Sequence, residues 1–150
     1  MRLPVAHDPD LKSIGLRFRT PGLILALAIV LATAAAIPAG YYVKANQELR
    51  AAAIALTGGN PDRAPQIMMR YGCAGCHTIP GVERANGLVG PALTDVRRRM
   101  YIAGVLENTP ENLIRWIVDR LRVDPRTAMP VTGITPQEAR HVAAYLYALR

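Results

Sequence analysis

The chain has 150 residues, of which 51% are apolar, 19% are charged and only 5% are aromatic. This composition is too apolar for a disordered chain and too poor in aromatic residues for a large conventional core. Lys and Arg outnumber Asp and Glu by 18 to 11, which gives a formal net charge of +7. The two cysteines exclude a four-cysteine zinc site and a scaffold with several disulfides. We therefore expect one small domain with a further segment attached.

The N-terminal part of the chain contains a stretch without formal charges, residues 20–43. As a helix, residues 23–43 would be about 31 Å long, close to the ~30 Å thickness of the hydrocarbon core of a bilayer. Two interpretations fit this stretch: a transmembrane helix, or a cleaved signal peptide with an A-x-A site at residues 34–36. We take the transmembrane helix as the prediction, with residues 1–19 as a separate N-terminal segment.

Basic residues predict the orientation of this helix. More of them precede the span than follow it closely: Arg2, Lys12, Arg17 and Arg19 before it, Lys44 and Arg50 after it. The positive-inside rule then places residues 1–19 in the cytoplasm and residues 44–150 on the outer side, the periplasm of a bacterial inner membrane. Because the basic outer domain would face away from the cytoplasm, we expect no nucleic-acid partner.

The remainder of the chain is predicted to be helical. Residues 44–59 extend the first helix as a short linker, which Thr57-Gly58-Gly59 ends. Residues 60–150 form a domain with three helices, which start at Asn60-Pro61-Asp62, at Thr109-Pro110-Glu111 and at the capping box Thr135-Pro136-Gln137-Glu138. No stretch alternates as a strand does, so the predicted class is all-α.

Two of these helices have a clear apolar face. In the second helix it consists of Leu113, Ile114, Trp116, Ile117 and Leu121, and in the third of Ala139, Val142, Ala143, Leu146 and Leu149. Three short helices give a thin core, so we expect another group to fill it.

Cys73-Ala74-Gly75-Cys76-His77 forms a C-x-x-C-H motif, the attachment signature of a c-type haem. Two thiols at this spacing can bond to the two vinyl groups of one porphyrin, and the histidine that follows can reach the iron. A thioredoxin-type motif would need a βαβ context, and a zinc site would need further ligands nearby, and the sequence offers neither. The motif predicts one covalent haem c, whose apolar disc fills the core.

With this motif, residues 60–150 resemble the class I cytochromes c. The resemblance also rests on four other segments: Tyr71-Gly72, Gly90-Pro91, Met129-Pro130 and Ala144-Tyr145-Leu146. In that family the proline of the Gly-Pro pair accepts a hydrogen bond from the proximal histidine, which implies that Pro91 orients His77.

The first helix departs from the family pattern. Where the family has a small glycine and an aromatic residue, this chain has Pro65 and Met69. These two positions therefore do not support the family's close crossing of the first and last helices.

Three segments are similar to the cytochrome c domains fused to, or associated with, haem-copper terminal oxidases: Gly90-Pro-Ala-Leu-Thr94, Arg99 to Ala103, and Asn108 to Leu113 followed by Trp116. In those domains the matching arginine and tryptophan lie against the haem propionates, so the resemblance implies this role for Arg99 and Trp116. On the residues alone, a solvated arginine and a core tryptophan are the alternatives. Arg97 and Arg98 are expected to be surface charges.

The residue on the other side of the iron decides between a carrier and a catalyst. The candidates are Met68, Met69, Met100, Met129 and His141, because His7 would lie across the membrane. We predict Met129, since it lies in a loop between helices and Met129-Pro130 matches the family. Met68 and Met69 are expected in the core, and Met100 sits where the family does not place its ligand. His141 is expected on a solvated helix face.

A His/Met pair leaves no open position on the iron, so the protein is predicted to be an electron carrier and not an enzyme. The sequence predicts a membrane-anchored carrier of a respiratory chain that donates to a haem-copper terminal oxidase, as its subunit or as a tethered donor. Its electrons would come from a quinol-oxidising complex or another cytochrome. The alternatives are a haem subunit of a periplasmic or membrane dehydrogenase complex, and a sensor or peroxidase with an open iron site.

Overall fold

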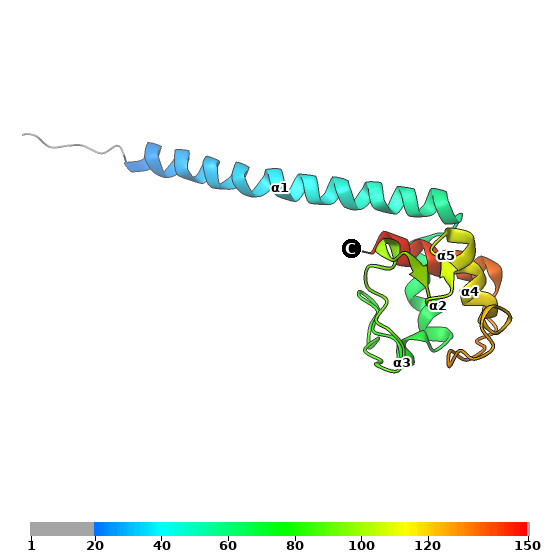
Figure 1. Ribbon diagram of the computed structural model, residues 1–150. Coiled ribbons are helices and arrows are strands. Elements are labelled where there is room, and N and C mark those ends of the chain that lie inside the picture. The colour runs from blue at the N-terminus through cyan, green and yellow to red at the C-terminus, as the bar shows by residue number, and fades with distance from the viewer. Residues whose placement is uncertain (1–19, 150) are drawn as a thin grey trace, which may run out of the picture. The chain divides into compact units, whose positions relative to one another are not determined.

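A computed structural model describes residues 20–149, so the predictions for residues 1–19, His7 included, lie outside the described residues. The chain divides into two compact units, one ending at Gly40 and the other beginning at Tyr41. In chain order the elements are α1 (Thr20–Thr57), η1 (Pro61–Arg63), α2 (Ala64–Arg70), α3 (Cys73–Cys76), η2 (Val96–Arg98), β1 (Tyr101–Ile102), β2 (Leu106–Glu107), α4 (Pro110–Val123) and α5 (Pro136–Ala148) (Figure 1).

Helix α1 is 38 residues long and includes the uncharged stretch (Figure 1). Its large apolar side chains between Leu23 and Val43 are exposed, which is typical of a helix that faces lipid. Among the described residues it is the one helix that is long and apolar enough to cross a membrane, by length and composition. It ends at Thr57, before Gly58 adopts a left-handed conformation with φ of 65°.

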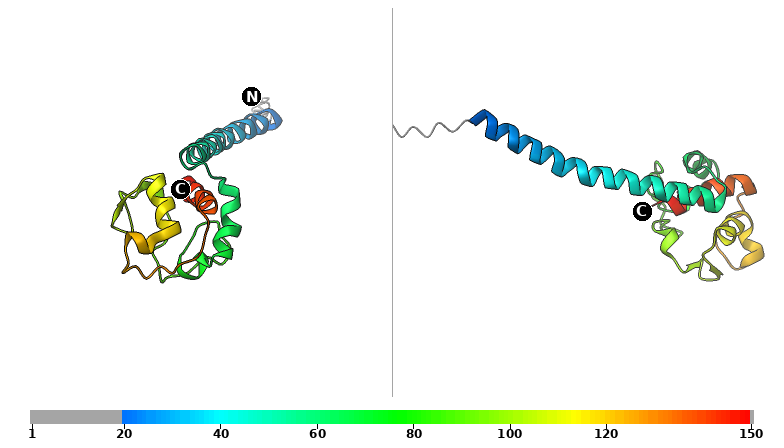
Figure 2. Two further views of the ribbon diagram at one scale, coloured as in Figure 1. Left: turned by 90° about the vertical axis from the view of Figure 1, so that its right-hand side faces the viewer. Right: turned by 90° about the horizontal axis from the view of Figure 1, so that it is seen from above.

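Helix α5 is the centre of the second unit, where it packs against η1, α2 and α4. Figure 2 shows α5, in red, between α2 in green and α4 in yellow. Four residues of its predicted apolar face are buried: Ala139, Val142, Ala143 and Leu146. The capping box at Thr135 and Glu138 is present at its start. The all-α prediction is confirmed.

The helices η1 and α2, which follow α1, both pack against α5. They do so although α2 carries Pro65 and Met69 where the family has a glycine and an aromatic residue. The close approach is made earlier in the chain, at Gly59, where a Cβ atom would overlap the carbonyl group of Arg140. The N–H of Asn60 then donates to Nδ1 of His141 over 2.8 Å. The closest approach to α5 is therefore made by the backbone that precedes η1, and α2 also packs against α5.

Two predictions about burial were wrong on these helices. His141 is only 7% exposed, because residues 59 and 60 cover the side of α5 that the helical periodicity assigns to solvent. Met69 is 45% exposed, whereas Met68 is fully buried, because Ala64, Ile67 and Met68 form the buried face of the short α2 helix and Met69 lies outside it.

Helix α4 also differs from its predicted pattern. Leu121 is 40% exposed, whereas the neighbouring Arg120 is fully buried. The cause is a kink at Asp119, whose φ of −142° and ψ of 63° are not helical. The kink changes which residues of the last turn face inward.

The structure contains one small antiparallel pair of strands among the described residues. Tyr101 of β1 lies opposite Glu107 of β2, and Ile102 lies opposite Leu106. Two residues per strand are too few for an alternating pattern to show in the sequence.

Candidate functional site

The C-x-x-C-H motif lies on a single helical turn, α3, and the residue that follows it. Gly72 precedes the turn in a left-handed conformation with φ of 73°, and the N–H of His77 closes the turn by donating to the carbonyl of Cys73 over 3.0 Å. Both cysteines are partly buried, and they do not form a disulfide with each other. Burial raises the pKa of the Cys73 thiol. This turn places both thiols and the imidazole on the wall of one cavity.

The cavity has a volume of about 510 Å³, within the range of ~300–1,000 Å³ that is usual for ligand sites. Most of its wall is apolar and comes from helices far apart in the sequence. Besides the motif, these helices contribute Met68 from α2, Leu113 and Ile117 from α4, and Val142 and Leu146 from α5. The cavity therefore lies between the helices, where a larger protein would have a core of apolar side chains.

All seven residues predicted for the site line this same cavity: Cys73, Cys76, His77, Pro91, Arg99, Trp116 and Met129. They come from α3, the loop after it, α4 and the loop before α5. Of the other candidates for an iron ligand, Met100 is 79% exposed and His141 is bonded to Asn60.

The orientation of His77 is defined by the next loop. Its Nδ1 lies 2.7 Å from the carbonyl oxygen of Pro91, and because a carbonyl only accepts, Nδ1 carries the proton of this hydrogen bond. The unprotonated Nε2 is then available to bind a metal. Gly90 lies against the imidazole, and a Cβ atom there would come within 2.7 Å of Nδ1. The N–H of Gly90 donates to the carbonyl of Cys76 over 2.8 Å, which holds the loop against the motif.

Met129 is carried by the loop between α4 and α5, and its backbone is bonded on both sides. Its N–H donates to Oγ1 of Thr127 over 3.3 Å, and its carbonyl accepts from Nε of Arg120 over 3.1 Å. These two bonds fix the backbone that presents the thioether to the cavity.

Arg99 and Asn108 also line the cavity, and their side chains hold the backbone of its loops. The Arg99 guanidinium donates to the carbonyls of Ala92 and Thr94, so it braces the loop that follows Pro91. The Asn108 amide donates to the carbonyls of Val96 and Arg99 over 2.7 and 2.8 Å, and its oxygen accepts from the hydroxyl of Tyr147. Asn108 opens a segment quoted for the resemblance, but no role was predicted for it, because an asparagine before an N-cap by itself indicates only a turn.

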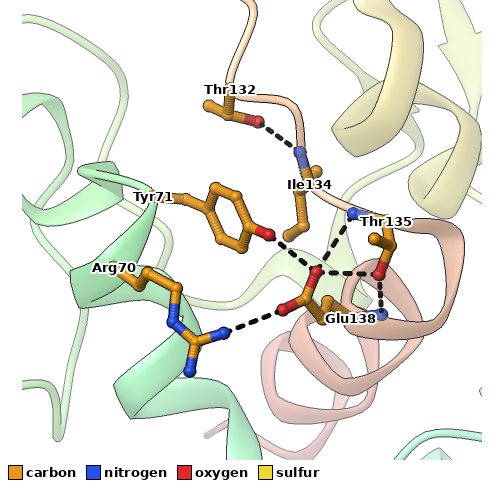
Figure 3. Close-up of polar contacts among 6 residues, drawn as sticks. All are labelled: Arg70, Tyr71, Thr132, Ile134, Thr135 and Glu138. Carbon is orange, nitrogen blue, oxygen red and sulfur yellow. Dashed lines mark hydrogen bonds and ion pairs between the residues drawn. The ribbon is translucent and has the colours of Figure 1, made fainter.

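Tyr71 also lines the cavity and was not among the predicted site residues. Its hydroxyl donates to Oε2 of Glu138 over 2.7 Å, and Glu138 also accepts from Thr135 and pairs with Arg70 over 3.1 Å (Figure 3). The hydrogen bonds from Tyr71 and Thr135 hold the pKa of Glu138 below its usual value, and the bond to the carboxylate raises the pKa of Tyr71.

Comparisons with known proteins bear on this site. Residues 61–150 match the family model described as Cytochrome c. Cytochrome c oxidase subunit 2 of Alkalihalophilus pseudofirmus is 35% identical over 86 residues, which are 57% of this chain and 24% of that protein. Cytochrome c oxidase subunit 2 of Bacillus sp. (strain PS3) is 33% identical over 89 residues, which are 57% of this chain and 25% of that protein. The chain thus spans about a quarter of the length of these relatives. No solved structure matches.

Proposed function

Because its residues 61–150 match the family model, the chain belongs to the cytochrome c family, and from this membership we propose that it donates single electrons to a haem-copper terminal oxidase. Membership implies electron transfer and one covalently attached haem c. The observation that carries the choice of partner is the similarity to two proteins named cytochrome c oxidase subunit 2. In this proposal the protein is a subunit of such an oxidase or its tethered donor.

The residues of the cavity fit a haem c. Two thiols, an imidazole with a bonded Nδ1, a thioether and a guanidinium line a mainly apolar space. We propose that Cys73 and Cys76 hold the haem covalently, and that His77 and Met129 bind its iron. Arg99 and Trp116 would contact the propionates.

The iron of the haem supplies a redox couple of one electron. The role of the protein is to hold the residues around the haem in one arrangement in both redox states. Pro91 holds the imidazole of His77 in one tautomer, and Thr127 and Arg120 hold the backbone of Met129. The mainly apolar wall would limit the access of water to the iron, which together with a thioether ligand would favour the reduced state. If His77 and Met129 both bound the iron, no position would be left for oxygen or peroxide, and the group would only gain and lose an electron.

The ligand assignment is tested by the far-red absorption band that an iron–methionine bond gives in the oxidised protein. We expect the full-length protein to show this band, Met129→Ala to lose it, and Met100→Ala to keep it, because Met100 is 79% exposed. If Met129→Ala keeps the band, the assignment is wrong. If the unchanged protein lacks the band, the proposal gives way to a sensor or peroxidase with an open site.

The choice of partner is tested by purification from membranes in mild detergent. A copper-containing oxidase among the co-purifying chains would support the proposal, and a dehydrogenase would contradict it.

The proposal also includes α1 as the single membrane anchor, with residues 44–150 on the periplasmic side of the inner membrane. Protease added to the outer face should then cleave the haem domain from intact spheroplasts, whereas protection would contradict this orientation.

A further inference from the structure

Arg120 on α4 is a fully buried charged residue. Its guanidinium donates from Nε to the carbonyl of Met129 over 3.1 Å and from Nη1 to the carbonyl of Ile117 over 3.5 Å. Its Nη2 is also buried and has no hydrogen-bond partner among the described residues. Burial lowers the pKa of the Arg120 guanidinium, which nonetheless stays charged at neutral pH. Burying a charge is costly, so its position calls for a role in the fold.

The kink in α4 directs this residue inward and its neighbours outward. Beyond the kink at Asp119, Arg122 and Arg126 have side chains that are 88% and 92% exposed, and they pair with Asp119 and Asp124. Arg115, before the kink, is also exposed. The inward position of Arg120 is therefore specific to this residue within an arginine-rich segment.

The acceptor of Arg120 lies in a loop with little regular structure of its own. Residues 124–135, between α4 and α5, are outside the helices and strands. The other bond to the Met129 backbone comes from Thr127 of the same loop, over 3.3 Å. The bond from Arg120 is thus the one of these two that joins Met129 to a helix.

Filling space in the core does not explain why this position has a charged guanidinium. Apolar residues of similar volume often replace buried charges at no loss of stability. An apolar residue here would leave the Met129 carbonyl, which lies in a part-buried position, without this donor. Arg120 is not part of the cavity wall, so any effect on the haem site passes through Met129.

We propose that Arg120 is a positioning residue that holds the Met129 loop through the Met129 carbonyl and so sets how often Met129 leaves the iron. This inference rests on the proposed function, because it takes Met129 as the iron ligand.

The test uses the full-length, oxidised holoprotein in detergent, titrated with imidazole. Imidazole binds the iron only in the fraction of molecules from which Met129 has dissociated, so its apparent affinity rises with that fraction. We expect Arg120→Gln and Arg120→Met to bind imidazole about tenfold more tightly, as expected for the loss of a hydrogen bond from a charged donor. Arg120→Lys should fall between these variants and the unchanged protein. Arg122→Gln, on the exposed side of α4, is the matched control and should not change the affinity.

Thermal unfolding followed by circular dichroism, on the same samples, separates positioning from a purely structural role. An unchanged imidazole affinity in Arg120→Gln overturns the proposal, even if the melting temperature falls. If Arg120→Gln and Arg120→Met do not fold, Arg120→Lys decides, since it keeps the charge but lacks the second donor arm. It must then bind imidazole more tightly than the unchanged protein, and equal affinity overturns the proposal.

Met129→Ala distinguishes failure of this inference from failure of the proposed function. If Met129 is the ligand, this variant binds imidazole more tightly than every Arg120 variant. If Met129→Ala leaves the imidazole affinity unchanged, the ligand assignment fails and the inference fails with it. If Met129→Ala binds tightly and the Arg120 variants match the unchanged protein, only the inference fails.

Discussion

Gly90 is a residue on which the candidate site depends without contributing a side chain to it. The space that a side chain would need is taken by the His77 ring, while the Gly90 N–H is bonded to Cys76 and the carbonyl of the next residue accepts from His77. Neither the ring nor the loop can move away without breaking one of these bonds. Any side chain at this position is therefore expected to destabilise the site.

We expect Gly90→Ala to destabilise the holoprotein by about 1–3 kcal/mol, the usual cost of adding a methyl group to a filled space. Denaturant unfolding of the haem-loaded protein measures the free energy, and the covalent haem content of the purified protein measures the effect on assembly. Gly75→Ala is the matched control, because a Cβ atom at Gly75 meets nothing within 4 Å. Equal stability of Gly90→Ala and the unchanged protein would contradict the role given to this glycine.

The sequence predicted some of these residues and not others, for a physical reason. Cys73, Cys76 and His77 could be recognised because covalent attachment to one porphyrin fixes their spacing. Gly90 and Arg120 could be understood only in three dimensions, since the first depends on a ring facing it and the second on a kink at Asp119. From sequence alone, an arginine in a helix is predicted to be exposed, and only the fold shows what surrounds it.

Between elements, the contact of Tyr71 with Glu138 joins the segment before the haem motif to the start of α5. Glu138 accepts hydrogen bonds from Tyr71 and from Thr135 of its own capping box, and it pairs with Arg70 (Figure 3). One carboxylate thus completes the cap of a helix and fixes a residue of the cavity wall.

We expect Tyr71→Phe to lower the melting temperature at pH 7, and the difference from the unchanged protein to disappear in acid. The pKa of Glu138 is lowered in the folded state, chiefly by the bond from Tyr71. Its contribution to stability is therefore fully present above the unfolded value of about 4.3 and is lost as the pH falls through the folded value. Melting curves between pH 3 and 7 test this, with Tyr101→Phe, at an exposed tyrosine, as the control. A difference that stays constant over this range would contradict it.

The packing of α5 shows where helical periodicity is insufficient. It predicted the face formed by Ala139, Val142, Ala143 and Leu146, because that face meets other helices. It placed His141 in solvent because periodicity describes one helix at a time and contains no information about the chain at Gly59 and Asn60 that covers the opposite side.

For the whole molecule, the end of α1 belongs to the compact unit that holds the cavity. Residues 41–57 lie within that unit, where Ala53 is 2% exposed and Arg50 pairs with Asp62 over 2.7 Å. The Thr57 carbonyl accepts from Arg140 of α5 over 3.1 Å. Residues 44–59 were predicted to be a helical linker, and these contacts show that the segment is also part of the packing.

We expect a chain that begins at Tyr41, secreted and loaded with haem, to be soluble without detergent and as stable as the full-length protein. A chain that begins at Asn60 should be less stable by about 1–3 kcal/mol, because it loses the burial of Ala53 and the bonds to Arg140 and Asp62. Denaturant unfolding of the two shortened proteins measures the difference. Equal stability would show that residues 41–59 are only a connection.

The position of α5 after the C-x-x-C-H motif in the chain has a consequence for the order of assembly. The two thiols and His77 are synthesised well before Val142 and Leu146, which complete the cavity wall from the last helix. A chain whose last helix has not yet folded therefore offers the two thiols and His77 but no finished cavity to receive a ligand. Any covalent attachment at that stage would act on an open, accessible segment, and the closing of the last helix would then enclose what had already been joined.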